Sequence, residues 1–376
     1  QEEALAAANA GLAYGDDAVA IYFRGIFLAE LERHEEALAD FERALAINPG
    51  YVDALASSAP SLRKLGRDPE GVRLIDRALE LDPHHVNAMV IKGVLLHEQN
   101  RCHEALQIFD QAIAIHGPDR ALLLKRAYAC FSIGRLEEGF RDYESRWGER
   151  AQGKLNKRPE FGVPHWSGEP LEGRSIYIFP EQGLGDSIQF MRYIPLVAAM
   201  ARQVYFSLPN PIVPLTARFP ANCRLLGKEE AIPSLDFACS MLSLPMAMGT
   251  SLQTIPAEVP YVDVDPALID KWRRRLGPKT GPRVGLVWSG NVTYSADQHR
   301  SIPLEMLRAV APPDVQFVSL QKEIRESDRE AASTWPGFIL TGDEQGSFAD
   351  AAALACLMDV VITVDTSVGH MTGALG

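Results

Sequence analysis

The first 150 residues repeat a pattern of small, large apolar and polar positions every 34 residues. Each unit has a small residue and, further along, a large apolar one. The small positions are Gly25, Ala59, Gly93 and Ala127, and the large ones are Phe41, Ile75, Phe109 and Tyr143. Pro49, Pro83 and Gly117-Pro118 close three of the units. Small residues let two helices approach, large apolar residues fill the next hairpin, and proline ends a helix, so the pattern predicts stacked helical hairpins.

Arginine and glutamate repeat in the same register. They occupy Arg33, Arg67, Arg101 and Arg135, and Glu36, Glu70, Glu104 and Glu138. This 34-residue pattern resembles the tetratricopeptide repeat. The resemblance implies an α-solenoid over residues 1–150 whose surface binds a protein. The alternative, an array that only stiffens or dimerises the chain, stays open.

Two places depart from the repeat pattern, and a third extends it toward the N-terminus. Pro60 falls inside a first helix, which we expect it to kink or shorten. Arg146-Trp147 replaces the Ala-Leu of the other units, so we expect Trp147 to pack against the following domain. Glu2–Ala10 resembles Glu35–Arg43, which predicts the second helix of an earlier repeat and a chain cut at its N-terminus.

A linker over residues 148–174, rich in glycine, proline and charge, separates the repeats from a different pattern. Trp166 is its expected anchor. A short apolar strand over Ser175–Pro180, a glycine turn, a helix over Asp186–Met200 and a strand over Gln203–Leu208 follow. This βαβ order predicts a parallel sheet.

A second set of short apolar runs predicts a second α/β domain. Strands are expected over residues 284–288, 315–320, 337–340 and 359–364, with helices beginning near Ile302 and over 348–358. We therefore expect three domains. They are a repeat domain over 1–150, a Rossmann-like domain with its linker over 151–276, and a second Rossmann-like domain over 277–376.

The first glycine turn carries Gly183-x-Gly185 but has Ile188 where a dinucleotide fingerprint needs its third glycine. No acidic residue follows about 20 residues later, which argues against an NAD-dependent oxidoreductase. Asp186 sits where the strand ends and the helix begins. It fits two interpretations, a helix N-cap or a residue at the crevice of an open α/β sheet.

Residues 364–376 predict a strand, a polar turn and a helix rich in small residues. The N–H groups at the start of this helix and the hydroxyls of Thr366 and Ser367 suit a diphosphate. The other interpretation is a capped, tightly packed helix with His370 in the core.

Net charge, apolar run length and cysteine spacing argue against several classes of protein. The formal net charge is −12, which argues against binding along a nucleic-acid backbone. No apolar run approaches the ~18 residues of a membrane span, and the acidic start is not a signal peptide. Five cysteines without a CxxC pair suit a reducing cytoplasm. Asp263 and Asp265 form a DxD, which we interpret as unrelated to metal binding because it lies between the two α/β domains.

Together these segments resemble the heptosyltransferase group of GT-B glycosyltransferases, in the bacterial branch that carries N-terminal tetratricopeptide repeats. O-GlcNAc transferases share the plan. The matching motifs are PHWSGEPLEGR (164–174), EQGLGDSIQFMRYIPL (181–196), SLP (243–245), VPYV (259–262), GLVWSGN (285–291), HRSIPL (299–304), FVSLQK (317–322) and VDTSVGHMTGALG (364–376).

The resemblance implies a role for each matched residue. Asp186 would be the general base, and Arg300 would stabilise the leaving diphosphate. The residues expected to bind the donor are Ser289, Asn291, Gln321, Lys322, Asp365, Thr366, Ser367 and His370. The acceptor-side loop would hold Gln182, Gly183 and Gly185. No metal or other cofactor is expected.

The implied function is an inverting, metal-independent glycosyltransferase of the bacterial cytoplasm. It would move a sugar from a nucleotide-sugar to an acceptor hydroxyl, on a protein recruited by the repeats. Members of the group continue past the segment that ends here at Gly376, so the second Rossmann-like domain is expected to be truncated. The alternative is a catalytically weak or inactive repeat scaffold for protein–protein interaction.

Overall fold

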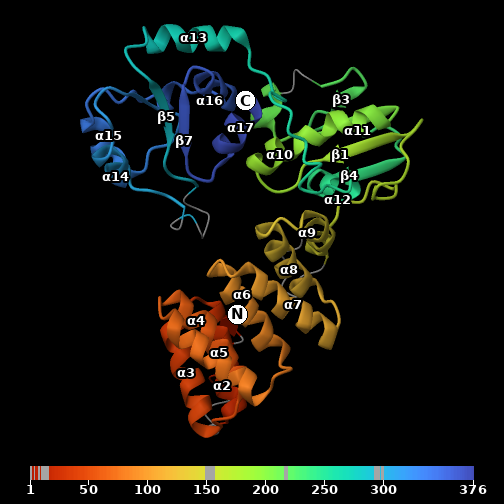
Figure 1. Ribbon diagram of the computed structural model, residues 1–376, viewed down its shortest axis with the longest axis vertical. Coiled ribbons are helices and arrows are strands. Elements are labelled where there is room, and N and C mark those ends of the chain that lie inside the picture. Colours follow the sequence, from red (N-terminus) through yellow and green to blue (C-terminus); the bar gives the residue numbers. More distant parts are fainter. Residues whose placement is uncertain are drawn as a thin grey trace. The chain divides into compact units, whose positions relative to one another are not determined.

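The computed structural model describes residues 2, 3, 5, 6, 9, 17–148, 157–215, 219–291, 297 and 300–376. The chain divides into two compact units, Gln1–Pro159 and Glu160–Gly376 (Figure 1). The helix expected over Glu2–Ala10 lies partly outside the described residues, as does part of the linker expected over 148–174. None of the described helices is long and apolar enough to cross a membrane.

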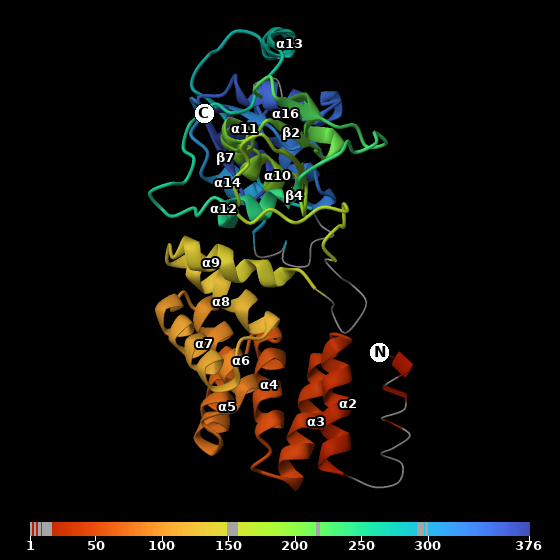
Figure 2. The same cartoon turned by 90° about the vertical axis from the view of Figure 1, so that its right-hand side faces the viewer.

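The first unit is a stack of helical hairpins (Figure 2). Its first helices, 13 residues each, are α2 (Ala18–Glu30), α4 (Val52–Lys64), α6 (Val86–Glu98) and α8 (Arg120–Ser132). Its second helices are α3 (His34–Ile47), α5 (Asp68–Leu81), α7 (Cys102–His116) and α9 (Leu136–Tyr143), the last followed by the 3₁₀ turn η1 (Glu144–Arg146). The helical solenoid predicted from the 34-residue period is confirmed.

The repeated small and large residues pack as the pattern predicts. A Cβ atom added at Gly93 would lie 2.4 Å from the ring of Phe109, so only glycine lets α6 approach α7 this closely. Phe109 is buried in a core with Met89 and Leu122 from the neighbouring first helices. Burial of such apolar surface is the main stabilising term of each hairpin.

Of the two effects expected of Pro60, the shortening of its helix is wrong, and the kink stays a prediction. α4 contains Pro60 and still has 13 residues, the same length as α2, α6 and α8. Leu55 and Leu62 on this helix are buried, and apolar packing on both sides of the proline outweighs the one lost backbone hydrogen bond.

Trp147 follows the last hairpin. Its ring is buried and lies beneath the guanidinium groups of Arg146, at 4.8 Å, and Arg158, at 5.4 Å. These cation–π contacts occur within the first unit. The expected packing of Trp147 against the next domain stays a prediction.

The second unit contains two parallel sheets. The first has the order β3-β2-β1-β4, with β1 (Ser175–Phe179), β2 (Gln203–Phe206), β3 (Cys223–Leu225) and β4 (Phe237–Ser240). The helices α10 (Leu184–Phe190) and α11 (Ile194–Met200) connect β1 to β2, with the 3₁₀ turn η2 (Met191–Tyr193) between them. The predicted helix over 186–200 is therefore two helices. Trp166 is buried, and its backbone N–H donates to Ala238 of β4.

The second sheet has the order β6-β5-β7, with β5 (Arg283–Val287), β6 (Gln316–Ser319) and β7 (Val360–Thr363). Four helices flank it, namely α14 (Leu304–Ala309), α15 (Arg329–Thr334), α16 (Phe348–Ala355) and α17 (Ser367–Leu375). The strand predicted over 337–340 is wrong as an element, because only a single bridge joins Ile339 to Val318.

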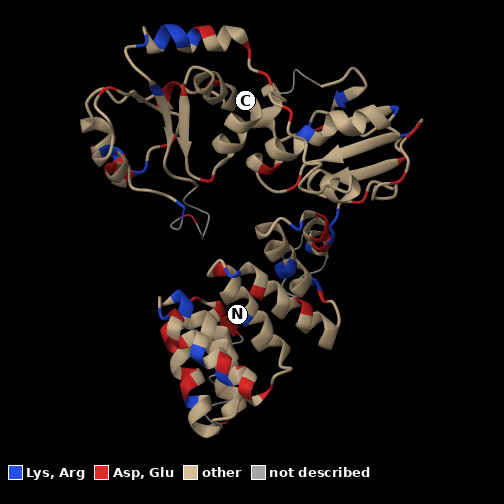
Figure 3. Cartoon of the chain, viewed as in Figure 1, with Lys and Arg blue, Asp and Glu red and all other residues tan. Residues whose placement is uncertain are grey.

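Helix α13 (Pro266–Leu276) precedes β5 and was not predicted. Asp265 caps it by accepting a hydrogen bond from the N–H of Ala267 at 2.8 Å. Figure 3 shows the run of basic residues along α13. Two of them pair with acids of the same unit, Lys271 with Asp350 at 2.8 Å and Arg275 with Glu344 at 2.6 Å. The second aspartate of the DxD is thus a helix cap.

Candidate functional site

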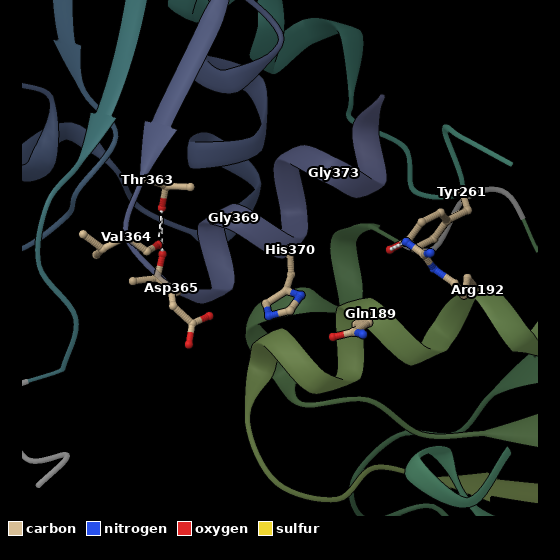
Figure 4. Close-up of a pocket in the computed structure, with 10 residues that line it drawn as sticks. Gln189, Arg192, Tyr261, Thr363, Val364, Asp365, Gly369, His370 and Gly373 are labelled. Carbon is tan, nitrogen blue, oxygen red and sulfur yellow. Dashed lines mark hydrogen bonds between the residues drawn. The ribbon is translucent and has the colours of Figure 1, made fainter. Parts of the chain in front are cut away.

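A cleft in the second unit lies at the carboxyl end of β7, between the start of α17 on one side and Gln189 of α10 and Arg192 of η2 on the other. In parallel sheets this carboxyl edge is the usual place for a ligand. Helices α10 and α17 pack against each other here. A cavity of about 380 Å³ lies beside them (Figure 4). Its lining residues are Gln189, Arg192, Tyr261, Thr363, Val364, Asp365, Thr366, Gly369, His370 and Gly373.

One wall of the cavity is the start of α17. Thr366 is its N-cap residue, and no side-chain hydrogen bond from Thr366 caps the described helix. The hydroxyl of Thr363 donates to the carbonyl of Val364 at 2.7 Å and lies 3.2 Å from the hydroxyl of Thr366. The helix therefore begins beside two hydroxyls, with its positive dipole end at the cavity. This arrangement can bind an anion.

His370 projects from α17 into the cavity (Figure 4). It is half-buried, so it does not lie in the core as the alternative interpretation of this helix required. A Cβ atom at Gly185 on α10 would lie 2.6 Å from His370 Cδ2. Gly185 thus permits the close approach of the two helices that bounds the cavity.

Asp186 acts as a cap within its own loop. One of its carboxylate oxygens, Oδ2, accepts a hydrogen bond from the N–H of Gly183 at 2.8 Å. Asp186 is not among the residues that line the cavity. Gln182, the residue before Gly183, is exposed and has a φ of 63°. The N-cap of α10 is therefore Gly183, and Asp186 bonds back to it from the third helical position, so the prediction that Asp186 itself is the N-cap is wrong.

Arg300 links the loop after β5 to the turn before α17. Its Nη1 donates to the carbonyl of Asp365 at 2.8 Å, and its Nε donates to Asp297 at 3.2 Å. A Cβ atom at Gly290 would lie 2.5 Å from the guanidinium, so the glycine of the Ser-Gly-Asn loop makes room for Arg300. A positive charge is thus held next to the start of α17.

Asp297 and Arg325, which were not predicted as site residues, fix the position of this arginine. Arg325 forms an ion pair with Asp297 and donates to the carbonyl of Gly290 at 3.2 Å and to Ser301 at 3.1 Å. Burial raises the pKa of Asp297, but hydrogen bonds from Arg325, Ser301 and Arg300 outweigh it and hold that pKa below its ordinary value. Asp297 is therefore a stable anionic anchor.

Other predicted donor-site residues lie outside the cavity lining. Gln321 is buried and supports the loop after β5. Its Oε1 accepts from the N–H groups of Trp288 at 3.2 Å and Ser289 at 3.1 Å, and its Nε2 donates to the Ser289 hydroxyl at 2.6 Å. Lys322 and Asn291 are exposed. Gln321 and Ser289 thus hold the loop that carries Gly290.

Arg192 and Tyr261 form the far wall of the cavity and were not predicted. Arg192 donates to the Tyr261 hydroxyl at 2.9 Å and to the carbonyl of Pro256 at 2.9 Å. Its guanidinium carbon lies 4.6 Å from the centre of the tyrosine ring. Arg192 falls within the motif after the glycine turn, but its partner is 69 residues away, and only the fold brings the two together.

Comparison with known proteins identifies the repeats. Models of the tetratricopeptide repeat match residues 18–51 and 58–119. The protein FlbA of Caulobacter vibrioides is 29% identical over 280 residues, which covers 67% of this chain and 46% of the relative. The chain thus spans about half the length of the curated relative it matches.

Solved structures of tetratricopeptide repeat proteins match part of this chain. A thermophilic TPR protein of Thermus thermophilus covers 37% of this chain and 78% of its own, at 18% identity and a TM-score of 0.35. A tetratricopeptide repeat protein of Parabacteroides merdae covers 38% and 56%, at 24% identity and a TM-score of 0.34. With the family match, the period and the observed hairpins, the first unit of this chain contains tetratricopeptide repeats.

Proposed function

We propose that the chain recruits a protein through its repeats and transfers a sugar from a nucleotide-sugar to a hydroxyl group through its α/β unit. Repeat arrays of this kind are typical of protein-binding scaffolds. The observation that carries the enzymatic part is one cleft lined by the start of α17 and two threonine hydroxyls, together with Arg300, which does not line the cleft but donates to the carbonyl of Asp365, which does. The sequence resemblance to GT-B glycosyltransferases supports the same assignment.

The donor diphosphate would bind at the start of α17. Negative charge grows on the departing diphosphate as the glycosidic bond breaks, and fixed donors stabilise it most when they need no rearrangement. Arg300 is already fixed by Asp365 and Asp297, and Thr363 and Thr366 present hydroxyls. The helix end and the guanidinium would supply the charge compensation for which other transferases use a metal ion. The displacement would invert the anomeric carbon.

Asp186 is the proposed general base, which would accept the proton of the attacking hydroxyl. Its Oδ2 accepts from Gly183, so Oδ1 is the atom available to a substrate. The two roles can be separated by substitution. Asp186→Asn keeps an oxygen that can cap Gly183 but removes the basic carboxylate, whereas Asp186→Ala removes both.

The test is calorimetry with a panel of nucleoside diphosphates, followed by nucleotide release from nucleotide-sugars. We expect Arg300→Ala to weaken diphosphate binding at least tenfold, because a charge-assisted hydrogen bond is lost. Arg329→Ala, at an exposed arginine on α15, is the matched control and should bind as the parent does. Asp186→Asn should keep binding and lose transfer. Equal binding by the Arg300 and Arg329 variants, or full transfer by Asp186→Asn, would contradict the assignment.

A second function is supported by the capping contact of Asp186. If that carboxylate only closes its loop, the α/β unit is inactive and the repeats are the working part, so the protein is a scaffold for protein–protein interaction. The same panel separates the two. A scaffold releases no nucleotide from any donor and binds no diphosphate, while it still holds its protein partner.

A further inference from the structure

The second repeat lacks a cation that the other three repeats carry. Three first helices have a basic residue at equivalent positions, Arg24, Lys92 and Arg126, each 34 residues or a multiple of 34 from Ser58. Ser58 is 2% exposed. Its hydroxyl donates to the carbonyl of Ala54 at 2.7 Å, within its own helix. The side chain therefore does not reach the neighbouring repeat.

Two of these cations join a first helix to the second helix of the preceding repeat. Lys92 Nζ lies 2.9 Å from Asp76 of α5, and Arg126 Nη1 lies 2.9 Å from Asp110 of α7. The equivalent acid in the first repeat is Glu42 of α3, which is exposed. Within the described part of the chain Glu42 makes no ion pair. The pair between the first and second repeats thus has its acid, Glu42, without its cation, because Ser58 stands at the position of the cation.

A cavity of about 190 Å³ lies at this place, formed by α3, α4 and α5. Ser58 and Glu42 are among its lining residues, and its apolar wall is made of Leu38, Leu45, Leu62 and Leu74. Leu74 stands where the first and fourth repeats have Asp40 and Asp142, the acids that pair with Arg24 and Arg126. The loss of the cation at 58 therefore coincides with an apolar lining.

The remaining charges at the cavity are Arg67, Glu70 and Arg73. Arg67 and Glu70 satisfy each other through two hydrogen bonds of 2.8 Å. Arg73 is exposed, and its counterpart in the fourth repeat is Arg141, which is also exposed. The fourth repeat carries Arg126 as well, so two cations occur together there at the positions of Arg73 and Ser58. Arg73 is thus compatible with a second cation in the cavity.

We propose that this cavity receives a lysine or arginine side chain of a partner protein. The aliphatic stem of that side chain would pack on the four leucines, and its charged end would meet Glu42, as Lys92 meets Asp76 one repeat later. The proposal rests on the protein-binding role of the repeats. It specifies a basic, extended segment as the partner chemistry at the second repeat.

The test is saturation-transfer NMR of the full chain with short acetylated, amidated peptides, Ala-X-Ala. X is arginine, lysine, the neutral arginine isostere citrulline, norleucine or glutamate. We expect the arginine and lysine peptides to bind at least fivefold more tightly than the other three. Equal binding of citrulline or norleucine, or preferential binding of glutamate at Arg73, would overturn the proposal.

Three variants tie the signal to the cavity. Ser58→Lys supplies the missing cation from inside, as in the third repeat, and should abolish the peptide signal. Glu42→Gln removes the acid from an exposed site, where folding is not at risk, and should weaken binding at least fivefold. Glu35→Gln, an exposed acid on the same helix α3, should leave binding unchanged. If the Glu42→Gln variant still binds the peptides as the parent does, the proposal is overturned, whatever the result with Ser58→Lys. Calorimetry with nucleotides tests the α/β unit separately, so failure of one proposal can be told from failure of the other.

Discussion

Each described hairpin of the repeat unit turns through one residue with a positive φ. These residues are Glu32 at 60°, Gly66 at 71°, Asn100 at 61° and Gly134 at 78°, spaced by 34. The N–H of the following arginine donates back to the first helix, as from Arg33 to Leu28 at 2.9 Å. This is the geometry of a Schellman helix end, which favours glycine at the left-handed position. Glutamate at position 32 therefore stores local backbone strain.

Glu32→Gly should relieve this strain. We expect an increase of about 0.5–1 kcal/mol in the free energy of unfolding. The strain removed from the left-handed residue exceeds the entropy that glycine adds to the unfolded chain. Gly66→Ala is the converse variant and should lose a similar amount. Urea unfolding followed by circular dichroism at 222 nm measures both. A lower urea midpoint for Glu32→Gly would show that the glutamate side chain stabilises the fold by more than the left-handed backbone conformation destabilises it.

Single residues also show what the sequence can and cannot predict about the site. Asp365, Thr366, Ser367 and His370 were predicted from one short motif, and all but Ser367 line the cavity, because neighbours at a strand–helix junction stay neighbours in the fold. Gln321 was predicted at the donor and instead supports the loop after β5. Arg192 and Tyr261 were missed, because their contact depends on how distant segments pack.

At the scale of elements, the contact of α10 with α17 defines the candidate site. Gly185 and His370 meet at this contact, and the space for a Cβ atom at position 185 is already taken by the imidazole. Gly185→Ala should therefore push the helices apart and destabilise the second unit by about 1–3 kcal/mol. His370→Ala in the same chain should restore most of the loss. Gly373→Ala on α17, where a Cβ meets no atom within 4 Å, is the control and should not destabilise. Thermal unfolding of the four variants measures these effects, and additive losses from Gly185→Ala and His370→Ala would refute the steric explanation.

The accuracy of element prediction followed the strength of the pattern. The hairpins of the first unit were predicted because several positions repeat in register. Strands β1, β2, β5, β6 and β7 were predicted from buried apolar runs. Strands β3 (CRL) and β4 (FACS) were not predicted, because neither contains a β-branched residue and β3 has only three residues. Helix α13 was missed although Asp265-Pro266 is a standard helix start and Leu268, Trp272 and Leu276 repeat every four residues.

At the scale of the whole molecule, the two units can be observed separately in one chain. Of the five tryptophans only Trp147 belongs to the first unit, while Trp166, Trp272, Trp288 and Trp335 belong to the second. Tryptophan fluorescence therefore reports mainly on the α/β unit, and the far-ultraviolet dichroism is dominated by the helices of the repeats. A ligand that binds one unit should shift one of the two unfolding signals.

A nucleoside diphosphate at ten times its dissociation constant stabilises the unit that binds it by about 1.4 kcal/mol. For a unit of this size that corresponds to about 3–6 °C in the unfolding temperature. We expect the diphosphate to raise the midpoint seen by tryptophan fluorescence and to leave the repeat-dominated dichroism midpoint in place. Arg300→Ala should abolish the shift, and Ser58→Lys, in the other unit, should keep it. A diphosphate that moves the dichroism midpoint instead would mean that the anion binds the repeats, and the site at α17 would then have to be abandoned, because its helix end and guanidinium lie wholly within the second unit.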